Sequence, residues 1–453
     1  MATTRSFWLI TIYLFLLALF SLFSYSLTDP NLVLSQSQLY WNFQTFMWQH
    51  IFMNHQLRFW LYLLLIISLF LTYLLFTSSL GKLGSLPVSA IAVRIKIFLV
   101  AVAVAGVVGL SHNALSHDVF NYMFNARMVL KYQSNPHEKV ALDFAQFDDW
   151  TRFMHNTHTP APYGYGWTGI SLVPSLLGGE AFLPTWLMFK IFAGLSLFLM
   201  YLAIRHAAKI LLSRELSVKE LALFFLNPLV LIEVLSSMHN DLWMMAPAMT
   251  AIALTVRLPA SHQKKWAGQL FVSALLLAFS ISIKQATLAL LPLWLLSIVL
   301  QMKILDLTDL ALKRFHLPTT FLNSLTSKFS KVVWPVVPVV AAASMFLPLF
   351  TVRSQQFLPW YWLWVLCWLP LISWKPIKAV LIAFSFGSAL RYLPWLWWGE
   401  YLPQVSLMEK IITWGVPIVL LLVWSKFASK SGFCRTIASG TVQDGTQRLI
   451  RLE

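Results

Sequence analysis

Long apolar stretches with few charges recur from one end of this chain to the other, and each is about 18 residues or longer. A helix of that length crosses the hydrocarbon core of a bilayer. Only 11% of the residues are charged and 58% are hydrophobic, whereas a soluble domain carries about 25% charged residues. The pattern therefore excludes a soluble enzyme and a disordered chain. It predicts an all-α polytopic membrane protein, with residues 1–453 forming a single integral membrane domain.

Hydropathy predicts about twelve transmembrane helices in this domain. The first follows Arg5 as a signal peptide would, but its apolar stretch continues to Leu27 without a small-residue cleavage site, so we interpret it as a retained helix. The predicted spans are residues 7–27, 59–79, 92–110, 182–204, 220–237, 242–258, 266–283, 285–302, 332–349, 357–373, 377–394 and 408–425.

The basic residues indicate how these spans are oriented. If the N-terminus is cytoplasmic and the connections alternate, most of the 33 lysines and arginines fall on the inner side, as the positive-inside rule requires. We therefore expect a plasma-membrane protein with both termini in the cytoplasm, including a C-terminal tail at 426–453. The net charge of +16 then reflects topology, and its short clusters do not indicate nucleic acid binding.

The largest predicted extracytoplasmic connection covers residues 111–181. Its stretch 165–178 is apolar but too short to span the bilayer, and a crossing there would place the basic connection 205–219 outside. We interpret this stretch as an interfacial or re-entrant helix that ends at Gly178 and Gly179. The connection is thus expected to carry interfacial helices, and with them the candidate active site.

Asp118 is the first ionisable residue that suggests chemistry on this side. It stands directly after the third predicted span, within Ser116–Tyr122, at the start of a predicted short helix that runs to Lys131. The carboxylate could cap that helix by accepting hydrogen bonds from its first N–H groups. With His117 beside it and Arg127 two to three turns further on, it could instead be a general base that takes a proton from a sugar hydroxyl.

Two further segments on the same predicted side have features of a binding site. Residues 159–166 contain two prolines and two glycines, which fix a rigid turn such as the lip of a site, although a plain connector is the alternative. His239, Asn240 and Asp241 stand side by side. Asn240 or Asp241 could be the N-cap of the next helix, but three such residues exceed what capping needs. Their spacing is not a metal-ligand motif, so we expect no metal.

Three cations complete the set of candidate groups. Lys284 lies at the outer turn between two predicted spans; its ammonium could extend to the headgroups or contact a lipid phosphate as a point charge. Arg353 and Arg391 occupy similar outer-edge positions, and the aromatic stretch 359–362 could belong to an interfacial belt. A reaction between a lipid phosphate and a hydroxyl acceptor fits these groups.

The motifs resemble those of the GT-C superfamily, whose polytopic glycosyltransferases use polyprenyl-phosphate sugars. The most similar members are the polyprenol-phosphate-mannose-dependent α-mannosyltransferases of the actinobacterial α-(1→6) type. One departure is Tyr165, which stands where that pattern has a proline after Pro-Ala-Pro-Tyr-Gly. The resemblance is carried, in the family's order, by Ser116–Tyr122 with Asn135–Pro136, by Thr159–Gly164, by Asn227–Pro228 to Asp241, by Lys284–Thr287 and by Pro359–Tyr361.

The resemblance implies a GT-C-like fold and an activity. The enzyme would move a hexose, mannose first, from a polyprenyl-phosphate donor to a glycan or glycolipid acceptor at the extracytoplasmic face, by an inverting displacement with Asp118 as catalytic base. No cofactor is expected. The expected substrate-binding residues are His117, Tyr122, Arg127, Tyr163, His239, Asn240, Asp241, Lys284, Arg353 and Arg391, the two last arginines being assigned from their position alone.

The main alternative is a transporter or flippase of lipid-linked sugars. Such proteins place charges near the bilayer midplane and are often built from repeated halves or broken helices, whereas the candidate groups here lie at one predicted edge. A non-catalytic assembly subunit is a second alternative, and it would leave the Asp118 and Lys284 clusters unexplained.

Overall fold

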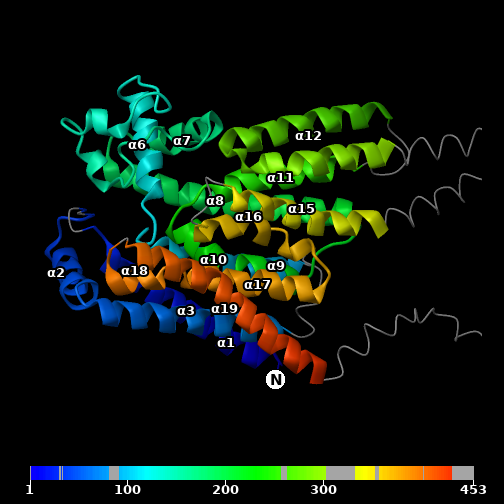
Figure 1. The fold of residues 1–453 in the computed structure, drawn as a ribbon, viewed down its shortest axis with the longest axis horizontal. Coiled ribbons are helices and arrows are strands. Elements are labelled where there is room, and N and C mark those ends of the chain that lie inside the picture. Colours follow the sequence, from blue (N-terminus) through cyan, green and yellow to red (C-terminus); the bar gives the residue numbers. More distant parts are fainter. Residues whose placement is uncertain are drawn as a thin grey trace, which may run out of the picture.

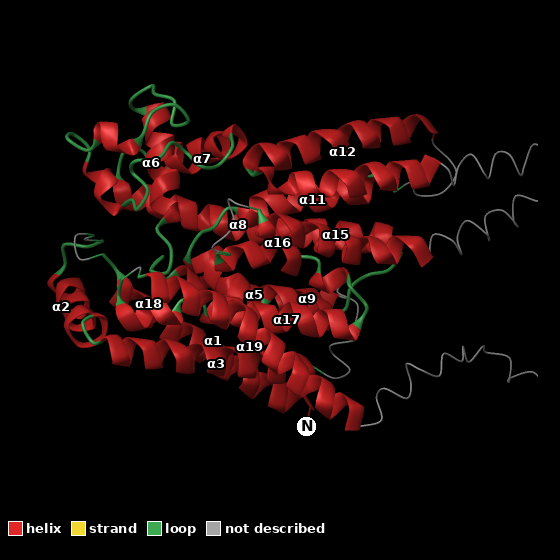
Figure 2. Cartoon of the chain, in the orientation of Figure 1, coloured by secondary structure: helices red, strands yellow, loops and turns green. Residues whose placement is uncertain are grey.

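The computed structural model is a bundle of helices whose axes run in broadly similar directions (Figures 1 and 2). Seven helices in the described part of the chain are long and apolar enough to cross a membrane. No strand occurs among the described residues. The predicted all-α polytopic membrane fold is thereby confirmed. The structure describes residues 2–29, 32, 34–80, 91–256, 263–302, 332–351, 357–400 and 402–430.

The α-helices are named by the labels of Figure 1. Short 3-10 and π-helices connect several of them, notably η5 (Leu231–Ser236), η6 (Gln285–Leu290) and η10 (Pro359–Trp362). The α-helices are α1 (Ala2–Ser24), α2 (Gln38–Met47), α3 (His55–Ser79), α5 (Ile91–Gly109), α6 (Asp118–Leu130), α7 (Tyr165–Leu177), α8 (Phe182–Leu211), α9 (Val218–Phe225), α10 (Pro228–Val230), α11 (Asp241–Leu254), α12 (Gln263–Ile283), α15 (Val337–Phe346), α16 (Leu363–Leu366), α17 (Lys375–Leu390), α18 (Leu393–Trp398) and α19 (Pro403–Lys430).

The expected spans differ in how regular they are. The expected spans 92–110, 242–258 and 332–349 coincide with apolar helices that are shorter than the seven long ones. The number of transmembrane helices therefore stays a prediction. The seven long apolar helices are Thr4–Leu27, His55–Ser79, Phe182–Leu211, Trp266–Ile283, Gln285–Met302, Lys375–Trp398 and Pro403–Lys426.

Two expected spans are broken rather than continuous. Residues 220–237 change from α9 to α10 at Asn227, whose side chain accepts a hydrogen bond from the Leu229 N–H at 3.0 Å, and a π-helix follows. Pro228 supplies no N–H, which interrupts the first helix. Residues 357–373 form short turns and the four-residue α16, because prolines recur in this segment as well. Both segments are buried inside the bundle.

Helix α11 forms the centre of one half of the bundle, where it packs against α8 on one side and α12 on the other. Its buried alanines, which include Ala248 and Ala251, let the neighbouring backbones approach closely. Asp241, the first residue of α11, is therefore fixed at one end of this packed layer, and the same end carries α6 and α7 (Figure 1).

Residues 111–181 gather at that end of the bundle, with α6 and α7 packed against each other and α7 against α8 and α12. Helix α7 covers the stretch expected to be interfacial, and Gly178 is its C-cap. Gly179 follows with a φ of 62°, a left-handed conformation that suits glycine. The end of α7 is therefore as the sequence predicts.

Lys190 fastens the segments that carry the site to α8. Its buried ammonium donates hydrogen bonds to the Ser111 carbonyl and, at 3.4 Å, to the Leu235 carbonyl. From the same helix, the Trp186 indole N–H donates to Asn113 Oδ1 at 2.9 Å. The connection before α6 and the helix η5 are thus tied to one rigid element.

Candidate active site

The Asp118 carboxylate is bound by tyrosines and does not cap α6. Oδ2 accepts hydrogen bonds from the Tyr163 hydroxyl at 2.5 Å and from the Tyr122 hydroxyl at 3.5 Å. The N-cap residue of α6 is His117, and no side-chain capping bond is formed there. Of the two interpretations of Asp118 left open by the sequence, helix capping is thus not what the carboxylate does.

Asp118 is enclosed by these neighbours but still opens to a cavity. Its side chain is 17% exposed, and its contacts with other side chains in the described structure all involve Oδ2. Burial raises the pKa of Asp118 above its ordinary value, and the Tyr163 hydrogen bond partly opposes this rise. The free oxygen, Oδ1, is thus available to a group in the cavity.

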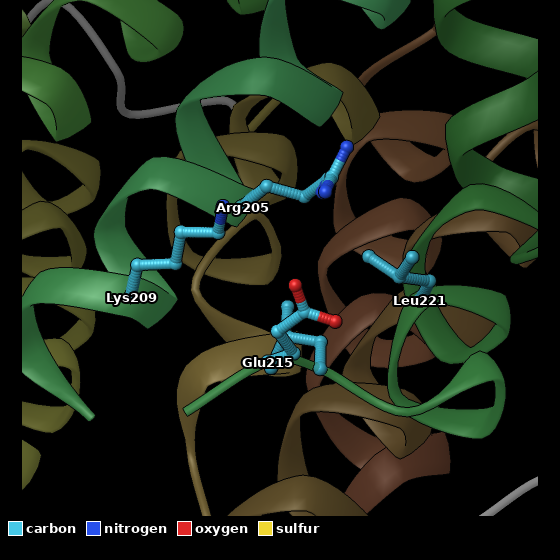
Figure 3. Close-up of a pocket in the computed structure, with 5 residues that line it drawn as sticks. Arg205, Lys209, Glu215 and Leu221 are labelled. Atoms are coloured by element: carbon cyan, nitrogen blue, oxygen red, sulfur yellow. The ribbon is translucent and has the colours of Figure 1, made fainter. Parts of the chain in front are cut away.

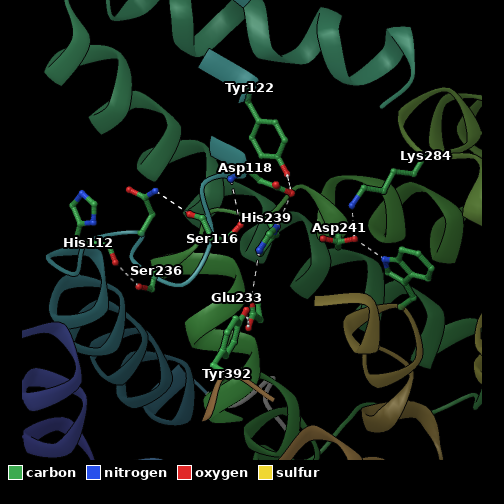
Figure 4. A network of polar contacts seen from close by, with 12 residues as sticks. His112, Ser116, Asp118, Tyr122, Glu233, Ser236, His239, Asp241, Lys284 and Tyr392 are labelled. Carbon is green, nitrogen blue, oxygen red and sulfur yellow. Dashed lines mark hydrogen bonds and ion pairs between the residues drawn. The ribbon is translucent and has the colours of Figure 1, made fainter. Parts of the chain in front are cut away.

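A second carboxylate lies behind Asp118, on the far side of His239 (Figure 4). His239 Nδ1 is 3.6 Å from Asp118 Oδ2, and its Nε2 is 3.4 Å from Glu233 Oε2. Both are ion-pair distances without hydrogen-bond geometry. Glu233 is completely buried and accepts a hydrogen bond from the Tyr392 hydroxyl at 3.0 Å.

The position of the His239 ring is fixed on several sides. Met238 has a φ of 59°, a conformation that costs a non-glycine residue free energy, and the His239 N–H donates to the Glu233 carbonyl at 3.0 Å. The Trp360 ring stacks on the imidazole with centroids 3.8 Å apart. Burial, together with the nearby Lys284 ammonium, lowers the pKa of His239 well below its usual range. The imidazole is therefore held in one orientation between the two carboxylates.

Lys284 and Asp241 form a buried ion pair next to Tyr163. The ammonium lies 2.7 Å from Asp241 Oδ1, and the same oxygen accepts a hydrogen bond from the Trp364 indole N–H at 2.5 Å. The ammonium also lies 4.9 Å from the centroid of the Tyr163 ring, which is a cation–π distance. Lys284 thus contacts the ring of Tyr163, whereas Asp118 binds its hydroxyl.

Tyr163 reaches both groups because the beginning of α7, which follows it, lies directly on the end of α12. The Gly164 N–H donates to the Ile283 carbonyl at 2.9 Å. A Cβ atom on Gly164 would overlap the Ser282 carbonyl oxygen, and one on Gly166 would overlap Ser282 Oγ. The two glycines therefore permit a close approach that no other residue would allow, and the turn at 159–166 is more than a connector.

We expect Gly164→Ala to displace the beginning of α7 and to lower the free energy of unfolding by about 1–3 kcal/mol, the usual cost of overpacking. Mannosyl transfer, which is the activity proposed below, should fall with it because Tyr163 moves away from Asp118. The matched control is Gly169→Ala in α7, where an added Cβ meets nothing within 4 Å and a helical alanine is favoured. Thermal unfolding of both purified variants would test this, and equal stabilities would contradict it.

A cavity of about 400 Å³ opens beside Asp118, a size that suits a small ligand. The ion pair of Arg391 with Glu409, whose atoms are 2.9 Å apart, also lines this cavity. A second hollow, at the C-terminal end of α8 next to Arg205 and Lys209, holds only about 10 Å³ (Figure 3). That is room for a single water molecule, so the Asp118 cavity is the candidate substrate site.

The other candidate residues have varied surroundings. His117 also lines the cavity and stacks on His155 with centroids 3.8 Å apart; burial, with His155, lowers the pKa of His117 to about 4. Arg127 binds Asp148 at 2.5 Å and packs over the Trp150 ring, so it secures the 111–181 connection and does not touch the Asp118 group. Arg353 lies outside the described residues.

Asn240 is completely buried next to these groups, and neither atom of its amide has a hydrogen-bond partner in the described structure. No cluster of three or more His, Cys, Asp or Glu side chains suited to a metal ion occurs among the described residues.

Sequence reasoning did not identify Glu233, Tyr392 and Trp360 as members of the site. A signal for Glu233 was present, since an acid inside an apolar stretch is costly unless it has a partner. Nothing in the sequence pairs Tyr392 with Glu233, because the two residues are 159 positions apart.

Comparison with known proteins connects this site to a family. No curated protein and no solved structure matches the chain. A family model described as alpha-(1->6)-mannopyranosyltransferase, N-terminal domain, matches residues 32–300. The match covers more than half of the chain and includes the segments that carry Asp118, Tyr163, His239 and Lys284. The chain therefore belongs to the alpha-(1->6)-mannopyranosyltransferase family and is a membrane-embedded mannosyltransferase.

Proposed function

We propose that the protein transfers mannose from a polyprenyl-phosphate donor to a hydroxyl of a glycan or glycolipid acceptor, with Asp118 as the base. The observation that carries the proposal is the Asp118 carboxylate, which lines the cavity and is held by Tyr163 through Oδ2, while Oδ1 has no side-chain contact among the described residues. A base must be held in place on one side and open to its substrate on the other. Its raised pKa also favours accepting a proton.

The reaction is a single displacement. The acceptor O–H bond breaks and its proton goes to Asp118, while the acceptor oxygen forms a bond to the anomeric carbon. The bond from that carbon to the phosphate oxygen breaks, and its electron pair leaves with the phosphate. A retaining mechanism would need a second, nucleophilic carboxylate. Glu409 is the other carboxylate among the described residues that line the cavity, and it is engaged in an ion pair with Arg391.

A lipid-linked donor fits the side of the cavity formed by α19. Leu402, Pro403 and Ser406 line the cavity, while Leu407 and Ile411 of the same helix are exposed and apolar, as lipid-facing residues are. Arg391 lines this side and is the cation that we assign to the donor phosphate. Lys284, enclosed by Asp241, Tyr163 and Trp364, is instead assigned to fixing Tyr163.

An extracytoplasmic active site fits the distribution of charge. Arg205 and Lys209 lie on the last turns of α8 (Phe182–Leu211), which places them about 35–40 Å from its first residue, at the active-site end. Basic residues favour the cytoplasmic side, so we place the cavity outside. A transporter would need polar groups across the bilayer, and the described polar network is instead concentrated at this end.

We expect purified protein in lipid nanodiscs to transfer radiolabel from polyprenyl-phosphate mannose to a mannoside acceptor, and to transfer none from GDP-mannose. The physical reason is that the described wall of the cavity offers the Arg391 cation beside a lipid-facing helix, which suits a monophosphate lipid. Transfer from GDP-mannose alone would contradict the donor assignment. Transfer from a different polyprenyl-phosphate sugar would change the sugar but retain the mechanism.

A further inference from the structure

Trp360 forms part of the cavity wall next to the base. One face of its indole ring is covered by the His239 ring, at a centroid distance of 3.8 Å and an interplanar angle of 21°. Tyr361 meets it edge-on at 5.8 Å. Because Trp360 nevertheless lines the cavity, it offers the cavity the part of its ring that His239 leaves uncovered.

The remaining lining resembles a surface for a sugar. A hexose has C–H groups on its ring faces and hydroxyls around its rim. An aromatic face carries negative charge density that attracts such C–H groups, and neutral polar side chains can bind the rim. Asn121, Asn156 and Ser406 line the same cavity as Trp360. An aromatic ring beside neutral amides and a hydroxyl suits a saccharide, whereas Arg391 and Glu409 form a charged part of the same lining.

The position of Trp360 favours the acceptor sugar over the donor sugar. His239 contacts both the Trp360 ring and Asp118 Oδ2, so the His239 imidazole bridges the indole and the base. A base must be within hydrogen-bond reach of the hydroxyl that it deprotonates. The donor phosphate needs a cation, and Arg391 supplies one on the wall that carries α19.

We infer that Trp360 is the platform on which the terminal hexose of the acceptor stacks, so that one of its hydroxyls reaches Asp118. This inference rests on the proposed function, since it takes Asp118 as the base. It adds a residue that determines acceptor binding and names its ligand as a neutral saccharide.

The test compares Trp360→Leu and Trp360→Phe in steady-state mannosyl transfer. Trp360→Leu should raise the KM for the acceptor by about 10-fold or more, with the KM for polyprenyl-phosphate mannose unchanged within about twofold. Trp360→Phe keeps an aromatic face and should lose less. The matched control is Trp41→Leu, since Trp41 lies on α2 and is 41% exposed outside the cavity. An unchanged acceptor KM in Trp360→Leu, or a fall in kcat alone, would overturn the inference, because Trp360 would then only support His239.

A binding measurement separates this inference from the proposed function. We expect saturation-transfer NMR to show α-(1→6)-mannobiose bound to the wild type and to Trp41→Leu, and its signal to be lost in Trp360→Leu. If this binding result is obtained but the wild type transfers sugar from no donor, the role of Trp360 as a saccharide platform stands and the proposed reaction is overturned. Equal binding by wild type and Trp360→Leu would overturn the platform while leaving the reaction intact.

Discussion

Asp118→Asn should abolish mannosyl transfer, with a fall in kcat of about 10²–10⁴-fold, the usual contribution of a general base. Asparagine has the size of aspartate, and its amide oxygen can still accept the Tyr163 hydrogen bond that Asp118 receives at 2.5 Å. It has no carboxylate to take the acceptor proton. Protein yield and thermal stability should therefore stay near wild type while transfer, measured with polyprenyl-phosphate mannose, is lost.

The control for this variant is Asp149→Asn in the same connection. Asp149 is exposed and its partner Arg152 is exposed as well, so its loss should leave transfer unchanged. A pH profile adds a second check. The base acts when ionised, and burial raises the pKa of Asp118, so wild-type transfer should fall on the acid side at a higher pH than an ordinary aspartate would give. Full activity of Asp118→Asn would contradict the assignment.

Removing the Tyr163 hydrogen bond should shift the pH profile in a defined direction. This hydrogen bond lowers the pKa of Asp118 against the larger effect of burial. Tyr163→Phe removes the bond, so the acid limb of the profile should move to higher pH. An unmoved limb would mean that another group titrates there.

The predictions from sequence succeeded where the signal is local. The helix that begins at Asp118 and the short apolar helix that ends at Gly178 lie where expected. Neighbouring residues are enough to specify a helix start, a helix end at glycine and the length of an apolar stretch. Residues 357–373 were expected to span the membrane and instead form short buried turns. An apolar stretch does not by itself distinguish lipid from a protein interior.

Contacts between distant segments could not be predicted in the same way. The sequence favours either headgroups or a phosphate as the partner of Lys284, whereas its ammonium binds Asp241, 43 residues away. In the sequence, Glu233 is a single acid within an apolar stretch. Its neighbours His239 and Tyr392 are recognised only in the folded structure. Such partners depend on how α11, α12 and α17 pack, which no single stretch of sequence specifies. Charged groups at a predicted edge can therefore be recognised as a cluster before their pairing is known.

Lys284→Met should lower the free energy of unfolding by about 3–5 kcal/mol, because it leaves the buried Asp241 carboxylate without its cation. The double variant Lys284→Met with Asp241→Asn should regain most of this loss. The amide that Asp241→Asn introduces is neutral and can still accept the hydrogen bond from Trp364. The control is Arg152→Met, whose exposed pair with Asp149 contributes little. Thermal unfolding in detergent gives all three values, and an unchanged stability of Lys284→Met would show that the pair does not stabilise the fold.

The double variant also decides which cation serves the donor phosphate. Both cations are buried and paired, Lys284 with Asp241 and Arg391 with Glu409, but among the described residues Arg391 lines the cavity and Lys284 does not. We therefore expect the double variant, once stable, to keep transfer within about tenfold of wild type, because Tyr163 retains its hydrogen bond to Asp118. A stable double variant whose transfer falls far below that tenfold limit, with a raised KM for the donor, would instead assign the phosphate to Lys284. The buried ion pair would then be a resting state that opens when the lipid donor binds.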